Sequence, residues 1–286
     1  MNISINGLTY QSLGRLPKNA EQSVQYLLVR LLIGTASVKR GTKVVKQTID
    51  FSALPSTPQS KTRSIAFDEF LSTYSVGCNS KKFIQITRPD NRIFYRDLLS
   101  EFSNFFIQTK NECHTAAFIF LYRTLERISY SIPLLYCSTQ SDYINTFKEL
   151  KSLLNPEIDG ELGLFKRFLN EGKFIDAIKL DITYTINFFS LQGYQGKFFD
   201  LTTKRYTKLF SKDSTLSQIE ITFREVPELL KTLRNRFFHL RTGDGKSNIG
   251  MDEIFDSDEY FACLNPIFCS FLAIVTLQTI AKKYQT

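Results

Sequence analysis

Three polar residues near the end of a long, largely apolar segment have the types and spacing of a proton-transfer site. Arg234 is followed directly by Asn235, and His239 comes four residues after Asn235. Residues four apart on an α-helix share one face, so Asn235 and His239 are expected to meet the same ligand. Histidine transfers protons near neutral pH, and arginine donates two hydrogen bonds to one phosphate without losing its charge. The segment therefore suits chemistry at a phosphate group.

The position of Arg234 requires a local change in the helix. Arg234 directly precedes Asn235, so in a regular α-helix its side chain turns away from the shared face by roughly 100°. The long side chain still reaches that face where a helix begins to unwind. The stretch Thr242-Gly243-Asp244-Gly245 supplies a stop signal soon after His239. We therefore expect His239 close to a helix end and partly exposed.

The pattern Arg-Asn-x-x-x-His from Arg234 to His239 resembles the signature of HEPN ribonucleases, helical domains that cut RNA without a metal or a cofactor. The resemblance covers these six residues and the helical character of 96–286, and not the first 95 residues. It implies a composite site to which two facing HEPN units each contribute an Arg and a His. Because the chain carries one such motif, the resemblance implies a homodimer. Members of the group act in abortive phage infection, in toxin–antitoxin pairs and as CRISPR-associated effectors.

RNA cleavage needs few chemical groups, and the motif holds them. A base takes the proton from a ribose 2′-hydroxyl, whose oxygen attacks the adjacent phosphorus, and an acid protonates the leaving 5′-oxygen. His239 suits the proton transfers, and Arg234 suits the charge that gathers on the phosphoryl oxygens. Asn235 would orient His239 or hold the phosphate. The expected products are a 2′,3′-cyclic phosphate and a 5′-hydroxyl, and no metal or cofactor is expected.

A second polar group lies in the otherwise apolar segment from Tyr122 to Tyr130. Arg123 and Glu126 are three residues apart and share a helix face. We predict that Glu126 pairs with Arg234 across the bundle and holds the guanidinium in place, with Arg123 in a supporting position. In that role Glu126 transfers no protons. The other interpretation is that these charges form the one solvated stripe of a buried helix.

The composition favours a reduced protein with a polyanionic partner. Lys and Arg number 36 against 28 Asp and Glu, which gives a net charge of +8, and this surplus is compatible with RNA binding. The five cysteines form no Cys-x-x-Cys pair, so we expect neither disulfides nor a zinc site, and a cytoplasmic location. The apolar stretch 261–281 is interrupted by polar residues, so we interpret it as a buried helix and expect no membrane partner.

The expected fold is mainly α and has two parts. Residues 1–95 form a small α/β or β-rich module of unknown role, with strands at 44–51 and 82–87 and a helix at 19–32. Residues 96–286 form a HEPN-like antiparallel helical bundle. Its helices are expected around 98–106, 116–133, 142–154, 161–171, 173–190, 215–240 and 257–283.

Three other groups are weaker candidates. Gly243-Asp244-Gly245-Lys246-Ser247 ends like a phosphate-binding loop but lacks the first glycine and a preceding strand. Cys113 and His114 are adjacent, so they point apart on a helix, and no second pair of metal ligands is near. The acidic residues within 252–259 suit a solvated loop and a helix N-terminus. We therefore expect no metal site.

The favoured function is a metal-independent endoribonuclease of anti-phage defence or a toxin, with an antitoxin or sensor protein as a further partner. The competing hypothesis is a non-catalytic HEPN-like subunit of a defence complex that binds RNA or protein. In that case charge changes at Lys39, Arg40, Lys81 and Lys82 would matter, and His239 would not. A third hypothesis is a membrane-associated effector that uses the stretch 261–281.

Overall fold

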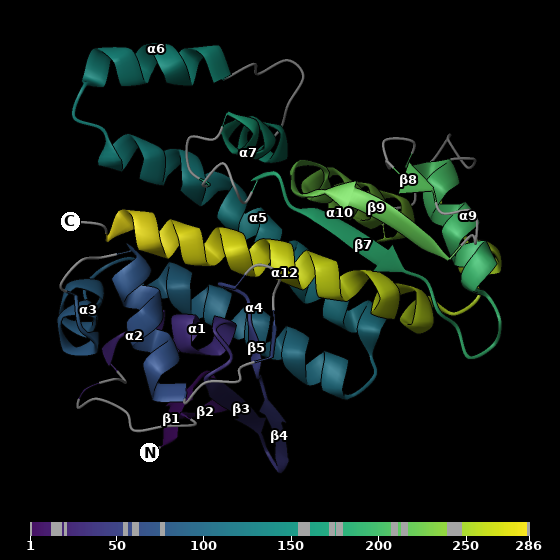
Figure 1. Ribbon diagram of the computed structural model, residues 1–286, viewed down its shortest axis with the longest axis horizontal. Coiled ribbons are helices and arrows are strands. Elements are labelled where there is room, and N and C mark those ends of the chain that lie inside the picture. The colour runs from purple at the N-terminus through teal and green to yellow at the C-terminus, as the bar shows by residue number, and fades with distance from the viewer. Residues whose placement is uncertain are drawn as a thin grey trace. The chain divides into compact units, whose positions relative to one another are not determined.

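The fold is mainly α, with short antiparallel sheets beside the helices (Figure 1). The computed structural model describes residues 2–12, 19, 22–53, 57–58, 63–74, 78–153, 161–171, 175, 180–206, 211–212, 217–238 and 248–284.

The chain divides into two compact units. The first comprises Met1–Asn111 together with Leu272–Thr286, and the second comprises Glu112–Phe271. The sequence predicts a boundary near residue 95, whereas the structure divides the chain after α4 (Arg92–Lys110). The reason is that α4 packs on α1 (Val24–Leu32) in the first unit.

A four-stranded antiparallel sheet forms one side of the first unit. A row of aligned residues crosses the sheet from Ile3 through Tyr10 and Val38 to Val45. The first three of these side chains are buried, so this row forms the inner face of the sheet. Tyr10 also shares a 3.0 Å hydrogen bond with Ser103 of α4. The strands, in spatial order, are β1 (Asn2–Ile5), β2 (Leu8–Ser12), β3 (Ala36–Arg40) and β4 (Lys43–Lys46).

The helices of the first unit surround α1, in which every residue is buried. Ser23 caps α1 by accepting a hydrogen bond from the Tyr26 N–H at 3.1 Å. The Tyr26 ring meets Phe67 with its centroid 4.6 Å away, and Phe67 in turn meets Phe83. The remaining elements of this part are β5 (Ile49–Asp50), β6 (Thr57–Pro58), α2 (Arg63–Tyr74) and α3 (Ser80–Thr87).

The strand predicted at 82–87 is wrong, because this segment lies in α3. The Asn79 side chain caps the helix by accepting a hydrogen bond from the Lys82 N–H at 2.9 Å. Phe83, Ile84 and Thr87 are then buried together, at a spacing that places them on one helix face. Tertiary packing thus overrides the preference of β-branched residues for strands.

The second unit holds most of the predicted helices. The helices expected at 142–154, 161–171 and 257–283 are confirmed by α6 (Tyr143–Leu153), α7 (Glu161–Asn170) and α12 (Ser257–Lys283). The helix expected to stop near Pro133 continues as α5 (His114–Thr139). Beyond the proline Tyr136 is buried and meets the Phe168 ring of α7 at 5.4 Å, and this packing supports the longer helix.

Part of the predicted all-helical region is a sheet. The strands β7 (Thr183–Asn187), β9 (Gln218–Thr222) and β8 (Ser211–Lys212) pair antiparallel in this order, and β7 and β9 lie side by side in Figure 1. The helix predicted at 173–190 is therefore wrong over the strand, as is the first part of the one at 215–240. Ile186 faces Ile219, and both are buried. Apolar residues alternate with polar ones in both segments, which is the period of a strand.

The long helix α12 belongs to both units, since the division falls between Phe271 and Leu272. Of the described helices, α12 is the one long and apolar enough to cross a membrane, yet 89% of its apolar window is buried in the protein. Such burial is typical of a core helix.

Candidate functional site

The motif is carried by α10 (Val226–Leu233) and the turn that follows it. Pro227 occupies the first turn of α10, where its missing N–H costs nothing. Val226, Leu229, Leu230 and Leu233 are buried, and their spacing forms one apolar stripe. This stripe fixes α10 in the unit, where the helix lies against α5. The position of the next residue, Arg234, is thereby fixed as well.

Residues Arg234–Phe238 form a π-helical turn, which we call the π-turn. Its aromatic residues anchor it: Phe238 stacks on Phe118 at 5.6 Å, and Phe237 meets Phe261 at 5.3 Å. The backbone carbonyl of Arg236 accepts a hydrogen bond from the Ile249 N–H at 2.8 Å. Single π-helical turns inside helices are frequent at functional sites. The two rings thus hold the end of the turn against the aromatic core of the second unit.

The Arg234 side chain leaves the π-turn and lies over α5. Its guanidinium carbon is 4.8 Å from the centre of the Tyr122 ring, a distance at which the ring face attracts a cation. Nη2 is 3.9 Å from Glu126 Oε1, and the two side chains are 31% and 47% exposed. The pairing that the sequence predicts between Arg234 and Glu126 is thus present as a loose, solvent-screened ion pair.

Asn235 contacts the arginine next to it. Its Oδ1 accepts a 3.0 Å hydrogen bond from Arg234 Nη1. Arginine has five N–H groups, and this is the one hydrogen bond that Arg234 makes to the described residues. The remaining N–H groups leave the guanidinium able to bind phosphate oxygens, which arginine does in pairs of hydrogen bonds. Asn235 therefore helps to hold the guanidinium.

Tyr122 contacts Arg234 and belongs to the site, although the sequence did not predict it. Burial raises the pKa of Tyr122 first, and the nearby Glu126 carboxylate raises it further, while the Arg234 charge lowers it. The Tyr122 ring and the Glu126 carboxylate both approach Arg234 from α5, so together they support the guanidinium. The signal was available, because Tyr122 precedes Glu126 by four residues and shares its helix face.

The other predicted site residues are placed less fully. Arg123 is exposed on α5, one turn before Glu126. His239 lies outside the described residues, as does the glycine-rich stretch 243–247. The structure therefore brings together Arg234, Asn235 and Glu126 of the predicted set, with Tyr122 added.

The second histidine, His114, begins α5. Burial lowers its pKa, and the carboxylates of Asp258 and Glu112 act in the opposite direction. Asp258 itself caps the helix start by accepting a 2.6 Å hydrogen bond from the Thr115 N–H. The carbonyl of His114 accepts a 2.8 Å hydrogen bond from Asn265 Nδ2. These contacts make His114 part of the junction between α5 and α12.

The acidic residues at 252–259 are engaged in local contacts. Asp256 caps the start of α12 by accepting from the Glu259 N–H at 2.9 Å, and Glu259 accepts from the Leu191 N–H at 3.0 Å. Among the residues that the structure describes, no three His, Cys, Asp or Glu side chains are grouped to hold a metal ion.

No family model, curated protein or solved structure matches this chain. The resemblance to HEPN ribonucleases therefore rests on the motif itself.

Proposed function

We propose that this protein is a metal-independent endoribonuclease. Arg234 neutralises the charge on the phosphoryl oxygens, His239 transfers protons, and Asn235 holds the guanidinium. Tyr122 and Glu126 position Arg234 from α5. The observation that carries the proposal is the partly exposed Arg234 guanidinium, held by a ring, an amide and a carboxylate five residues before a histidine.

The contacts that hold the Arg234 guanidinium in place favour a catalytic role over that of a solvated surface arginine. A solvated arginine loses side-chain entropy when it binds a phosphate. Arg234 has already lost part of it through its contacts with Tyr122 and Asn235. The ion pair with Glu126 is long at 3.9 Å, so the carboxylate orients the guanidinium without occupying its N–H groups. A phosphate bearing charge in the transition state then binds a group that is already in place.

The resemblance extends the proposal to the assembly. We propose a homodimer in the cytoplasm whose two copies each supply Arg234 and His239 to one composite site. A role in abortive infection or as a toxin, restrained by an antitoxin or sensor protein, belongs to the same proposal.

An RNA cleavage assay in EDTA tests the activity. Parent, His239→Ala and Arg236→Ala proteins are incubated with total RNA, and the new termini are mapped. The parent and Arg236→Ala proteins are expected to leave 2′,3′-cyclic phosphate and 5′-hydroxyl ends, and His239→Ala is expected to leave none. Equal cleavage by parent and His239→Ala would contradict the assignment, as would cleavage that requires a divalent metal.

A second candidate function is binding of RNA without cleavage, and the β3–β4 hairpin favours it. Arg40 and Lys43 are directly opposed across the two strands, and like charges in such a pair repel. Lys39 and Lys46 add two further cations, and the segment 36–46 contains no acidic residue. A polyanion would relieve this repulsion. In this case Lys39→Ala and Arg40→Ala would weaken RNA binding measured by fluorescence anisotropy, and His239→Ala would not.

A further inference from the structure

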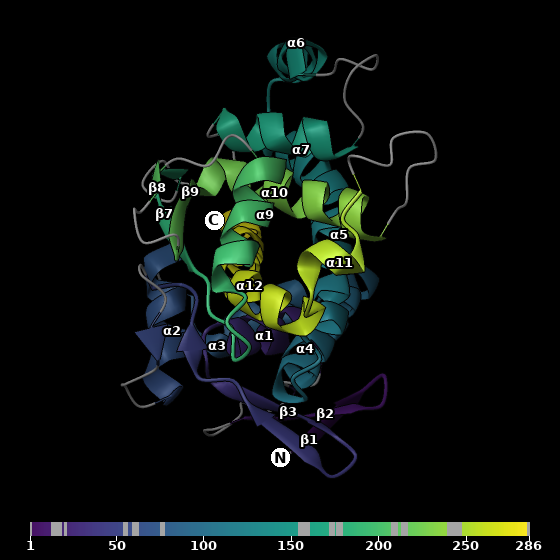
Figure 2. The same cartoon turned by 90° about the vertical axis from the view of Figure 1, so that its right-hand side faces the viewer.

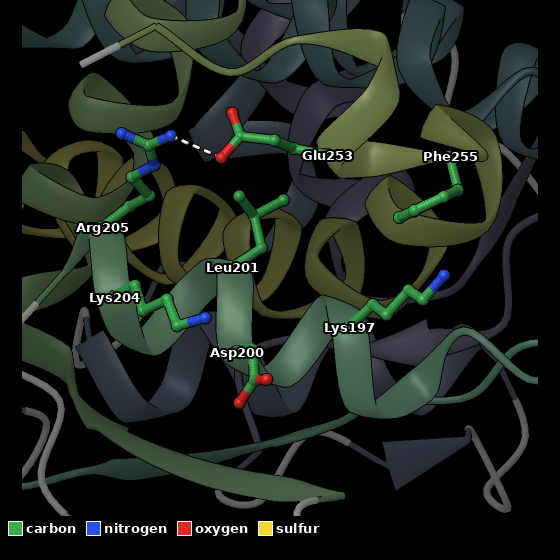
Figure 3. A pocket seen from close by; sticks show the side chains of 7 residues that line it. All are labelled: Lys197, Asp200, Leu201, Lys204, Arg205, Glu253 and Phe255. Carbon is green, nitrogen blue, oxygen red and sulfur yellow. Dashed lines mark hydrogen bonds and ion pairs between the residues drawn. The ribbon is translucent and has the colours of Figure 1, made fainter. Parts of the chain in front are cut away.

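The helices α9 (Gln195–Arg205) and α11 (Met251–Ile254) contact each other (Figure 2). Residues of α9 and of the segment around α11 line a pocket of about 460 Å³ (Figure 3). This volume is within the range of small-ligand sites. The residues that α9 contributes include Lys197, Leu201 and Lys204. They are four and three residues apart, so they follow one face of the helix.

One charged pair in the pocket is already satisfied. Arg205 Nη2 lies 2.5 Å from Glu253 Oε1, drawn as the dashed line in Figure 3. The second carboxylate oxygen of Glu253 accepts a hydrogen bond from the Gly250 N–H at 3.2 Å. This pair closes one wall of the pocket and joins α9 to α11.

The other charged side chains of the pocket have no charged partner among the described residues. Lys197, Asp200 and Lys204 are exposed on α9, and none of them forms an ion pair with any residue that the structure describes. Two lysines on either side of one carboxylate suit a ligand that carries both an anion and a hydrogen-bond donor. A bare phosphate would be repelled by Asp200, so a simple anion fits the pocket poorly.

The apolar wall is held in a strained conformation. Phe255 has a φ of 57°, which is unfavourable for a bulky side chain and recurs at binding sites. Its ring is 42% exposed, stacks on Tyr194 at 4.9 Å, and lies 3.7 Å from Lys197 Nζ. These contacts keep an aromatic ring at the rim of the pocket opposite Leu201, where it offers an apolar surface to a flat group.

We propose that this pocket binds one nucleotide of an RNA strand. Lys197 and Lys204 bind phosphate oxygens, Asp200 accepts a hydrogen bond from the ribose 2′-hydroxyl, and the base lies against Leu201 and Phe255. The inference rests on the proposed endoribonuclease function and names the part of the substrate that binds beyond the cleaved phosphate.

A short segment connects the pocket to the π-turn. The Ile249 N–H donates to the Arg236 carbonyl at 2.8 Å, and the next residue, Gly250, donates to Glu253 in the pocket wall. The wall of the pocket and the turn that carries Arg234 are thus two hydrogen bonds apart. A strand of RNA is long enough to contact both.

RNA binding by a variant that is expected not to cut RNA tests the proposal without relying on activity. The His239→Ala protein is mixed with a short fluorescent RNA, and anisotropy is measured over a range of salt concentrations. A double variant Lys197→Ala/Lys204→Ala is compared with Lys148→Ala/Lys151→Ala, which removes the same number of exposed lysines from another helix, α6. We expect the first pair to lower the salt slope of log affinity by about 2, which is about 1 for each phosphate contact. The control pair leaves it unchanged.

Asp200→Ala separates recognition of ribose from charge. Removal of the carboxylate strengthens binding of any polyanion, so the affinity alone is not diagnostic. The diagnostic quantity is the ratio of RNA affinity to the affinity for DNA of the same sequence, because the 2′-hydroxyl distinguishes the two. We expect Asp200→Ala to reduce this ratio by about fivefold or more, the loss of roughly one hydrogen bond.

The outcomes separate the two proposals. Equal salt slopes for the two lysine pairs, or an unchanged ratio in Asp200→Ala, would overturn the pocket assignment even where the parent protein cuts RNA. If the Lys197→Ala/Lys204→Ala variant binds RNA more weakly and the parent protein does not cut RNA, the RNA-binding pocket stands and the nuclease function is rejected. Displacement of the RNA by a mixture of free ribonucleoside monophosphates at equal nucleotide concentration would reject a strand as the ligand in favour of a free nucleotide.

Discussion

Substitution of Arg234 tests whether the guanidinium acts through its charge or through its shape. Arg234→Lys keeps the charge but replaces the planar fork with a single ammonium, so one of two hydrogen bonds to a phosphate is lost. A hydrogen bond to a charged group contributes about 1.5–3 kcal/mol. Because about 1.4 kcal/mol corresponds to tenfold in rate, we expect cleavage by Arg234→Lys to fall by roughly tenfold to a hundredfold. Arg234→Ala also loses the charge, so its rate should fall further.

The same contacts set a limit on the loss of stability. Arg234→Ala removes a cation–π contact worth about 0.5–1 kcal/mol and a hydrogen bond worth about 0.5–1.5 kcal/mol. The 3.9 Å ion pair between side chains 31% and 47% exposed adds little after solvent screening. The free energy of unfolding should therefore fall by about 1–2.5 kcal/mol, which leaves the protein folded.

The assay is single-turnover cleavage of end-labelled RNA in EDTA, with protein in excess, beside a thermal unfolding curve for each variant. Arg236→Ala is the matched control, because Arg236 lies in the same π-turn, has the same charge and is also partly exposed. If Arg234→Ala cut RNA at the parental rate, or if Arg236→Ala lost as much activity, the role given to the Arg234 guanidinium would be refuted.

Three further predictions follow from individual contacts. Glu126→Gln should slow cleavage by at most about tenfold, because the exposed carboxylate only orients Arg234. The substitution should also lower the pKa of Tyr122, measured by NMR of labelled tyrosine. A loss of activity of about a thousandfold would instead make Glu126 a proton-transfer group. Phe118→Ala removes a fully buried ring that meets Phe261 at 4.5 Å and Phe268 at 5.8 Å, so the free energy of unfolding measured in urea should fall by about 3–5 kcal/mol. Burial raises the pKa of Tyr10 to about 12; the unfolded chain therefore ionises first above pH 10, and the urea midpoint should fall between pH 10 and 12, less steeply in Tyr10→Phe.

Helical periodicity identified the elements whose burial follows one stripe. The helix predicted around 215–240 includes α10, which carries the motif, and the apolar stretch 261–281 lies in the helix predicted at 257–283, which is α12. The prediction of α12 succeeds, and that of the motif helix holds only from Val226 onward, because 218–222 is a strand. A one-sided or fully buried helix leaves a regular pattern in the sequence. The pairing of Glu126 with Arg234 was one of two interpretations of the charges on this apolar helix, and the other was a solvated stripe; the structure shows both the ion pair and a half-exposed carboxylate.

Other features depend on contacts distant in the sequence. The strand β7 was predicted as a helix because the apolar residues near Phe188 and Phe189 fit both periods, and only pairing with β9 selects the strand. The π-turn could not be predicted from the sequence either, because it depends on how Phe237 and Phe238 pack on the rings of Phe118 and Phe261. The hydrogen bond from Arg234 to Asn235 follows from that turn, so the partner of Asn235 was not predictable from spacing alone.

Because both units share α12, we expect them to fold in a single cooperative event. Residues Ser257–Phe271 complete the core of one unit, and Leu272–Lys283 complete that of the other. Lys283 is fixed there by an ion pair to Asp90 at 2.5 Å, and Tyr284 donates to the same carboxylate at 2.8 Å. An excised N-terminal fragment would lack its last helix, and a fragment starting at residue 112 would expose the apolar half of α12. The chain is therefore expected to unfold in one thermal transition. Neither unit is expected to fold when it is expressed without the other.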